Sequence, residues 1–404
     1  MPPPLFPCLP LTAIPHRIPT SVWLLGFVSM LTDISSEMVH SLLPMYLLTT
    51  MGVSVLAIGI IEGIAESTAL VLKVFSGTFS DYVGRRKALV LTGYALSAIT
   101  KPVFPLATSL SVIMGGRFID RIGKGIRDAP RDALIVDITP APIRGAAFGL
   151  RQAIDTVGAF LGPLIAVALM LWWSNHFVWV FWVACVPAVL AVLLLLAVKE
   201  PTQNDNTTQV HRLRWSHIQH LSPRYGFVVI MGAVLGLARF SEAFLVLRAF
   251  DSDIPMAMVP LVMVVMNVVY AASAYPLGAL SDRFSHTALL AGGLLTLLAA
   301  DMCFAAGQHW GYVLGGVSLW GLHMGMTQGL LASMVAAEAP DELRGTAYGF
   351  YNLAMGLAML LSSTLAGWLW SQWGAEAAFV ASAGCCVLGV GLLCSNRFIS
   401  RSKN

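Results

Sequence analysis

The side chains in this sequence that could do chemistry are charged groups inside long apolar runs. In "MLTDISSEMVH", Asp33, Glu37 and His40 are spaced by four and three residues, which places them on one face of a helix. An apolar surrounding disfavours the charged form of an acid, so an embedded carboxyl group can exchange protons near neutral pH. Asp33 and Glu37 are therefore candidate proton-binding residues, and a buried structural ion pair is the alternative.

A second charged stretch, "GGRFIDRIGKGIRDAPRDALIVDITP", begins at Gly115. At intervals of four or three residues, one helical face of it would carry Arg117, Arg121, Lys124, Asp128 and Arg131. Lys124 is also spaced to pair with Asp120 and with Asp128. A charge near the bilayer centre costs about 2.5–3.5 kcal/mol, so this face must meet protein or water, and an aqueous central cavity is expected. The alternative is that the part from Arg127 onward projects into the cytoplasm.

Composition identifies the setting of these charges as a membrane. The 404 residues are 57% apolar and 11% charged, with a mean hydropathy of +0.76. Soluble domains are about 45–50% apolar and about 25% charged. Segments long enough for the roughly 20 residues of a membrane span lie at 20–48, 57–79, 88–107, 110–136, 144–172, 176–198, 225–248, 254–280, 287–306, 310–337, 343–371 and 376–396.

An internal repeat divides the chain in two. "GGRFIDRIGKG" from Gly115 matches "GGVSLWGLHMG" from Gly315, 200 positions later, and "IRGAAFG" around Arg144 matches "LRGTAYG" around Arg344 without a gap. Because the second copy is plainly apolar, the charged copy is predicted to be a membrane helix as well. We expect an all-α membrane protein with a tail (1–19), a six-helix bundle (20–198), a cytoplasmic linker (199–224), a second six-helix bundle (225–396) and a C-terminal tail (397–404).

Other embedded charges complete the candidate site. Arg151 and Asp155, four residues apart, can pair with each other on one helix, and "LARFSEAF" offers Arg239, Ser241 and Glu242. Aligning the two halves places Arg239 opposite Asp33, an arrangement that suits a site between repeats. A third polar set comprises Glu62, Glu66 and Lys73. His323 and Gln328 are interpreted as hydrogen-bonded core groups.

Charge asymmetry and cysteine placement bear on location and cofactors. Lys and Arg between the spans fall almost entirely on one side, which predicts that both termini are cytoplasmic and that the protein lies in the cell (inner) membrane. The proline-rich start, "MPPPLFPCLPLTAIPHRIPT", does not resemble a signal peptide. Five of the six cysteines lie in apolar spans without ligand spacing, so no metal site and no cofactor are expected.

Two six-helix halves with "GTFSDYVGRRK" after the second span resemble the major facilitator superfamily over essentially the whole chain. This gating motif and its partial second copy comprise Gly77, Asp81, Gly84, Arg85, Arg86, Gly278 and Asp282. The resemblance implies a latch that breaks when the cytoplasmic side opens, with Asp137 as the candidate partner of Arg85. "GRFID" is similar to the family's fourth-helix signature, which implies a role in proton coupling for Arg117.

The fifth span carries a motif that bears on direction. In "GAFLGP", Gly158, Gly162 and Pro163 match a pattern that the family's proton-driven exporters carry, although Ala166 and Val167 replace its final glycines. Small residues permit close helix contact, and proline is tolerated in membrane helices. A packing motif without functional meaning is the alternative.

The sequence therefore predicts a secondary active transporter that works by alternating access, similar to the proton-coupled efflux branch of the superfamily. Proton-coupled uptake of an organic anion, metabolite or metal chelate is the main alternative, and a membrane sensor or lipid-handling protein is a remote one. The expected partners are a small-molecule or ion substrate, protons and the lipid bilayer, without nucleic acid, and the chain is expected to be a monomer. No HExxH or GxSxG pattern suggests an enzyme.

Overall fold

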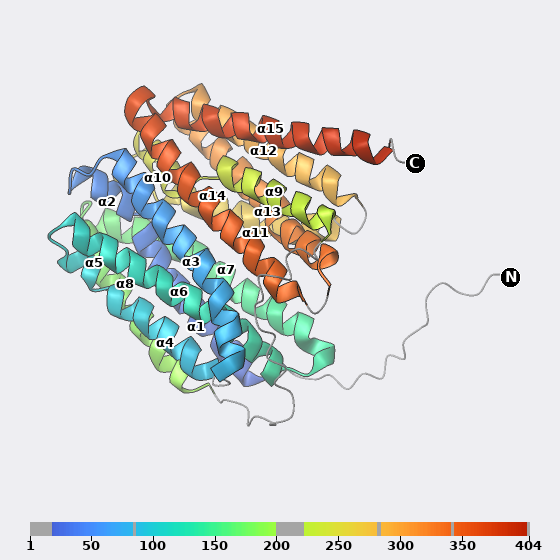
Figure 1. The fold of residues 1–404 in the computed structure, drawn as a ribbon. Coiled ribbons are helices and arrows are strands. Elements are labelled where there is room, and N and C mark those ends of the chain that lie inside the picture. The colour runs from blue at the N-terminus through green and yellow to red at the C-terminus, as the bar shows by residue number, and fades with distance from the viewer. Residues whose placement is uncertain (1–17, 84–85, 199–221, 281–283, 341–342, 402–404) are drawn as a thin grey trace.

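The computed structural model describes residues 18–83, 86–198, 222–280, 284–340 and 343–401, and the regular elements in these ranges are all helices (Figure 1). The first half contains α1 (Thr20–His40), α2 (Leu43–Thr49), α3 (Val55–Val83), α4 (Arg86–Thr100), α5 (Val103–Leu106), α6 (Leu110–Ile138), η1 (Ala141–Ile143), α7 (Arg144–Trp172) and α8 (Phe177–Leu196). The second half contains α9 (Pro223–Ala238), α10 (Ala243–Phe250), η3 (Met256–Met258), α11 (Leu261–Leu280), α12 (His286–Ala306), α13 (Trp310–Glu338), α14 (Arg344–Trp373) and α15 (Ala375–Arg401).

The two halves form similar bundles, seen in Figure 1 as a blue-to-green half and a yellow-to-red half. Within the first, α6 packs on α3 and α4; within the second, α13 packs on α11 and α12 in the same way. α6 and α13 begin and end 200 positions apart, at Leu110 and Trp310 and at Ile138 and Glu338. The prediction that the charged stretch is a membrane helix is therefore confirmed in its helical part, and the repeat explains why.

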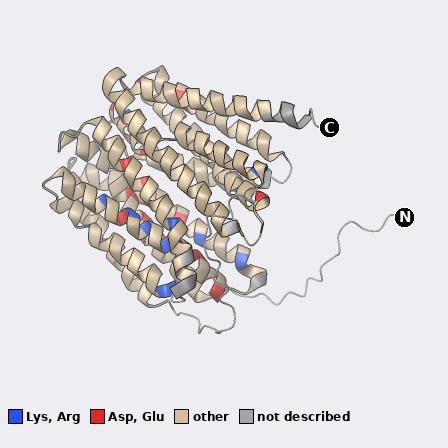
Figure 2. Ribbon diagram, viewed as in Figure 1, with Lys and Arg blue, Asp and Glu red and all other residues tan. Residues whose placement is uncertain are grey.

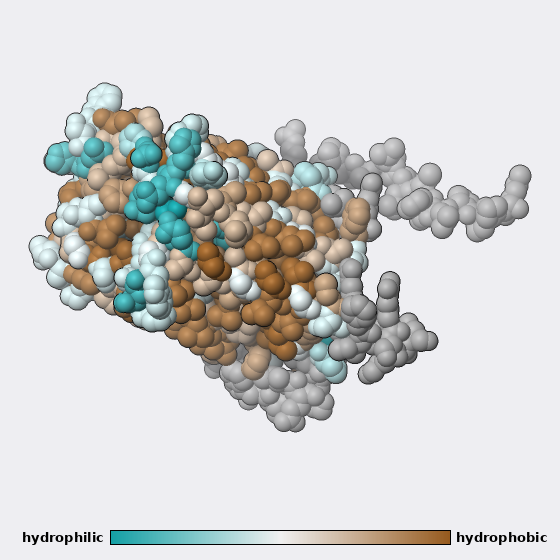
Figure 3. Space-filling view, turned by 90° about the horizontal axis from the view of Figure 1, so that it is seen from above, coloured by the Kyte–Doolittle hydropathy of each residue, from teal (hydrophilic) through white to brown (hydrophobic). Residues whose placement is uncertain are grey.

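Ten segments among the described residues are long and apolar enough to cross a membrane, and α6 and α13 are not among them. Both are nevertheless 29 residues long and enclosed by neighbouring helices of their bundle. Together with those ten segments they make the twelve expected spans. Figure 3 shows that hydrophobic residues cover much of one face of the molecule, as lipid contact requires, while hydrophilic residues gather toward one end.

Three of the expected spans are interrupted near their middle or end. α1 stops at His40 and α2 resumes at Leu43, where Pro44 can start a helix but not continue one. Lys101 and Pro102 separate α4 from α5. Residues 239–242 leave the helical path between α9 and α10, where the Ser241 amide donates to the Ser363 hydroxyl at 3.0 Å. Residues 199–221 of the expected linker 199–224 lie outside the described residues. α9 begins at Pro223 and is capped by Ser222.

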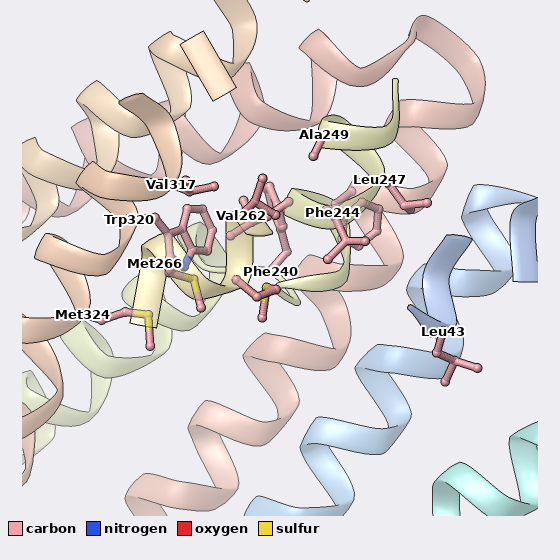
Figure 4. Packing of buried hydrophobic residues seen from close by; sticks show 14 of the residues in the cluster. Leu43, Phe240, Phe244, Leu247, Ala249, Val262, Met266, Val317, Trp320 and Met324 are labelled. Carbon is pink, nitrogen blue, oxygen red and sulfur yellow. The ribbon is translucent and has the colours of Figure 1, made fainter. Parts of the chain in front are cut away.

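The halves are joined mainly at one end, called the closed end below. There α2 packs against α10, and Leu43, Phe244 and Leu247 belong to one hydrophobic core together with Phe240 and Trp320 (Figure 4). α3 also packs on α14, where a Cβ on Gly63 would lie 3.2 Å from the Leu360 Cα. α7 packs on α11, and the Asn267 amide donates to the Ala159 carbonyl at 3.1 Å.

Candidate functional site

Charged residues are concentrated on the helices of the first half, whereas few lie in the second (Figure 2). At their centre, Arg117 of α6 donates to Glu62 of α3 through Nε to Oε1 at 3.1 Å and through Nη2 to Oε2 at 2.7 Å. Both side chains are at most 2% exposed. One turn further, Arg121 lies 3.2 Å from Glu66, whose side chain is 23% exposed. Glu62 and Glu66, the acids of the third polar set, are thus the partners of the predicted cavity residues Arg117 and Arg121.

Asp120 has a different partner from the expected one. Lys101, which lies in the break between α4 and α5, donates to Asp120 at 3.0 Å and to the Ser36 hydroxyl of α1 at 3.0 Å. The prediction that Lys124 pairs with Asp120 is therefore wrong. Lys101 joins three helices from a buried position, and a lysine inside the apolar run "AITKPV" was the signal that could have identified it.

The remainder of α6 is also neutralised within its own bundle. Asp128 lies 3.5 Å from Arg131 and 3.9 Å from Arg127, so its expected pairing with Lys124 is wrong too. Arg127 donates to the Ser97 hydroxyl and lies over the Tyr94 ring. Arg127 and Arg131 are buried in a continuous helix, so this part of α6 packs against protein.

Consequently, Arg117 and Arg121 of α6 do not line the expected cationic cavity. Arg117 and Arg121 point to acids of α3 and are almost fully buried. Among the described side chains, Lys124 has no acid within ion-pair distance. Lys124, Asp33 and Glu37 are all partly exposed, so these charges remain available to a ligand.

α7 supports those two acids through its glycines. A Cβ on Gly158 would lie 3.1 Å from the Asp33 Cβ, and a Cβ on Gly162 would lie 2.7 Å from the Glu37 Cβ. The expected pair of Arg151 with Asp155 forms at 2.6 Å on the same helix. The "GAFLGP" motif therefore lets α7 lie directly behind Asp33 and Glu37.

His40, the last residue of α1, lies between two acids. Its Nδ1 is 3.7 Å from Glu37 and its Nε2 is 3.5 Å from Glu62. His40, Glu62 and Glu66 also offer ligand atoms within 4.8 Å of one another, a spacing that suits a metal ion. Arg117 and Arg121 already occupy these carboxylates, and their charge would repel a divalent cation.

The second half contributes its charges at the break between α9 and α10. Arg239 lies 3.3 Å from Glu242, and the Gln328 amide oxygen, turned toward it, lies 3.1 Å from Arg239. Tyr270 is 2.9 Å from Gln328. Arg239 thus pairs within its own half, although it was expected to lie opposite Asp33. Arg239 and Glu242 remain 17% and 22% exposed.

Part of the gating motif is described. Gly77 and Asp81 lie near the end of α3 and Gly278 near the end of α11, while Gly84, Arg85 and Asp282 lie outside the described residues. Arg86 donates to Asp137 at 2.6 Å and to the Ala133 carbonyl at 3.1 Å. Asp137 therefore pairs with Arg86, the neighbour of the expected partner Arg85. The Arg86–Asp137 pair joins α4 to the end of α6.

Two related helical bundles with embedded charges near the level where they meet define a secondary transporter. The sequence profile described as Major Facilitator Superfamily matches residues 25–268 and 228–402, and the chain belongs to this family. It is 32% identical over 361 residues to an uncharacterized MFS-type transporter of Methanocaldococcus jannaschii, which covers 88% of this chain and 89% of that relative. It is 26% identical over 379 residues to the inner membrane transport protein YajR of Escherichia coli, which covers 90% and 80%.

A solved structure shows the same fold. A POT family transporter in complex with 5-aminolevulinic acid superposes with a TM-score of 0.78 at 12% identity, over 95% of this chain and 96% of that one. The protein is therefore a multi-pass membrane transporter of a small solute and not an enzyme.

Proposed function

We propose that this protein exports a small solute in exchange for protons by alternating access. The observation that carries the proposal is the placement of Asp33 and Glu37, two partly exposed acids that are each backed by a glycine of α7. A carboxyl group that can lose its proton next to a cation can exchange that proton for a solute at the same place.

The charge pattern favours a solute that carries both signs. The first half offers three partly exposed charges of both signs, Lys124, Asp33 and Glu37, and the other half supplies the mixed pair of Arg239 with Glu242. With Arg117 and Arg121 neutralised by acids of α3, the argument for a simple organic anion loses its main support. A zwitterion matches partly exposed groups of both signs better than an anion does.

The positive-inside pattern puts both termini in the cytoplasm, so the closed end would face outward and the site would open to the cytoplasm. The protein would also function as a monomer in the inner membrane.

The test starts with a thermal-shift screen of the purified protein against zwitterions, drugs, organic anions and metal chelates at pH 6 and pH 8. A stabilising solute is then tested in proteoliposomes that enclose a pH-sensitive dye. We expect an outward solute gradient to drive protons inward. Proton movement in the same direction as the solute would establish symport instead, and solute flux that ignores the proton gradient would reject proton coupling.

A further inference from the structure

His40 occupies a position where its charge can act on the closed end. It is 6% exposed and is the last residue of α1, and two residues separate it from the start of α2 at Leu43. Nδ1 of the ring faces Glu37 on α1, and Nε2 faces Glu62 on α3. A neutral imidazole has only one N–H and can donate to one of these acids, whereas a protonated imidazole can donate to both.

The charges around His40 balance only when it carries a proton. Arg117 is matched by Glu62 and Arg121 by Glu66. Among the described residues, Glu37 has no partner within ion-pair distance other than His40, which leaves one negative charge in excess. In the other half, Glu242 is paired with Arg239. An uncompensated buried charge is strongly destabilising, and a protonated His40 removes it.

A proton fits this position better than a metal ion does. A divalent cation between His40, Glu62 and Glu66 would add two positive charges where one is missing. It would also approach two guanidinium groups that already hold the carboxylates. The chemistry of the cluster therefore selects a single positive charge.

Loss of that proton would be transmitted directly to the contact between the halves. Without it, Glu37 and Glu62 face each other across a neutral ring, and their repulsion favours separation of the end of α1 from α3. α2 follows after only Ser41 and Leu42, and its packing against α10 helps to form the closed end.

We propose that His40 is a proton-binding residue whose protonation holds the closed end shut and whose deprotonation lets it open. The proposal rests on the proposed function and assigns the proton site that controls the conformational change. If protons alone shut the closed end in the absence of solute, protons drive the return of the empty exporter, as antiport requires.

The experiment measures the distance across the closed end by electron spin resonance. Spin labels are attached at the exposed positions Thr50→Cys and Asp253→Cys, which follow α2 and α10, in the full-length protein with its native cysteines replaced by alanine. The protein is held in lipid nanodiscs from pH 5 to pH 9 without solute. We expect a short distance at low pH and an increasing long-distance population as the pH rises.

Three variants decide the assignment. His40→Gln should show the long distance at every pH, and His40→Lys, which retains a positive charge, should show the short distance at every pH. His323→Gln is the matched control, because His323 is also buried but bonds the Gly293 carbonyl on α12. It should titrate like the unmodified protein.

A His40→Gln protein that titrates normally would overturn the proposal and leave proton-coupled export to be judged by the flux assay. If His40→Gln does not fold, normal titration of His40→Lys has the same meaning. A distance that ignores pH in the unmodified protein, or that responds to added Zn²⁺ instead, would also overturn it.

Discussion

Arg117 and Glu62 form a two-point ion pair inside the first bundle, with nitrogen–oxygen distances of 3.1 and 2.7 Å and almost no exposure of either side chain. The pair joins α6 to α3 in a region from which water is excluded. An arginine that resembles the family's proton-coupling residue is thus bound to an acid within its own half, and any coupling by Arg117 must act through Glu62.

The first prediction concerns removal of this acid. Glu62→Gln leaves the Arg117 charge buried without a counter-ion, which should cost about 3–5 kcal/mol of stability. Thermal unfolding in detergent measures the loss. Glu66→Gln is the matched control, because Glu66 is 23% exposed and water can solvate Arg121 in its place. Equal losses in both variants would show that burial of the Glu62 pair is unimportant.

The fold was largely predictable from the sequence, and the reason is the repeat. α6 contains too many charges to be recognised by hydropathy, yet its gapless match to α13 identified it as a helix with the correct bounds to within two residues. The interruptions at His40, Lys101 and Arg239 were missed, because a break of a few residues leaves the apolar run intact.

The partners of the charges were harder to predict. Spacing along one helix favoured Lys124 with Asp120 and Asp128, but these acids bind Lys101 and Arg131. Which helices face each other decides such pairs, and a single sequence does not contain that information. Only Arg151 with Asp155, a pair within one turn of α7, formed as expected.

The second prediction concerns proton exchange. Asp33→Asn and Glu37→Gln remove the two partly exposed acids that α7 backs at Gly158 and Gly162, so each should abolish solute-driven proton movement in proteoliposomes while the protein still inserts and folds. Asp253→Asn, in an exposed segment after α10, is the control and should retain full flux. Normal pH-driven transport in both acid variants would remove Asp33 and Glu37 from the mechanism.

The third prediction rests on hydrogen-bond counting at Asp301, a residue that the sequence interpretation overlooked. The Ser382 hydroxyl oxygen lies 2.5 Å from both Asp301 Oδ2 and the Ala238 carbonyl oxygen. One hydroxyl proton can serve only one of these acceptors, so the second proton must come from a protonated Asp301. Asp301 is fully buried, and no cation among the described residues pairs with it.

Asp301→Asn retains a donor at this position and should therefore change stability by less than about 1 kcal/mol. Ser382→Ala deprives both the Ala238 carbonyl and Asp301 of their partner and should cost about 1–3 kcal/mol. Thermal unfolding of both variants measures the difference. A large loss in Asp301→Asn, with little loss in Ser382→Ala, would indicate that Asp301 is ionised.

The fourth prediction separates a packing role of "GAFLGP" from a neutral one. A Cβ on Gly162 would lie 2.7 Å from the Glu37 Cβ and 2.8 Å from the Ile34 carbonyl oxygen, so even alanine must push α7 away from α1. Gly162→Ala should cost about 1–3 kcal/mol by overpacking, and it should also weaken proton flux because Glu37 is displaced. Gly149→Ala on the same helix is the control, since nothing lies within 4 Å of its added Cβ. If both variants unfold at the same temperature and carry protons equally well, close contact at Gly162 is not what holds Glu37 in place, and the position of Glu37 must then depend on its contact with His40.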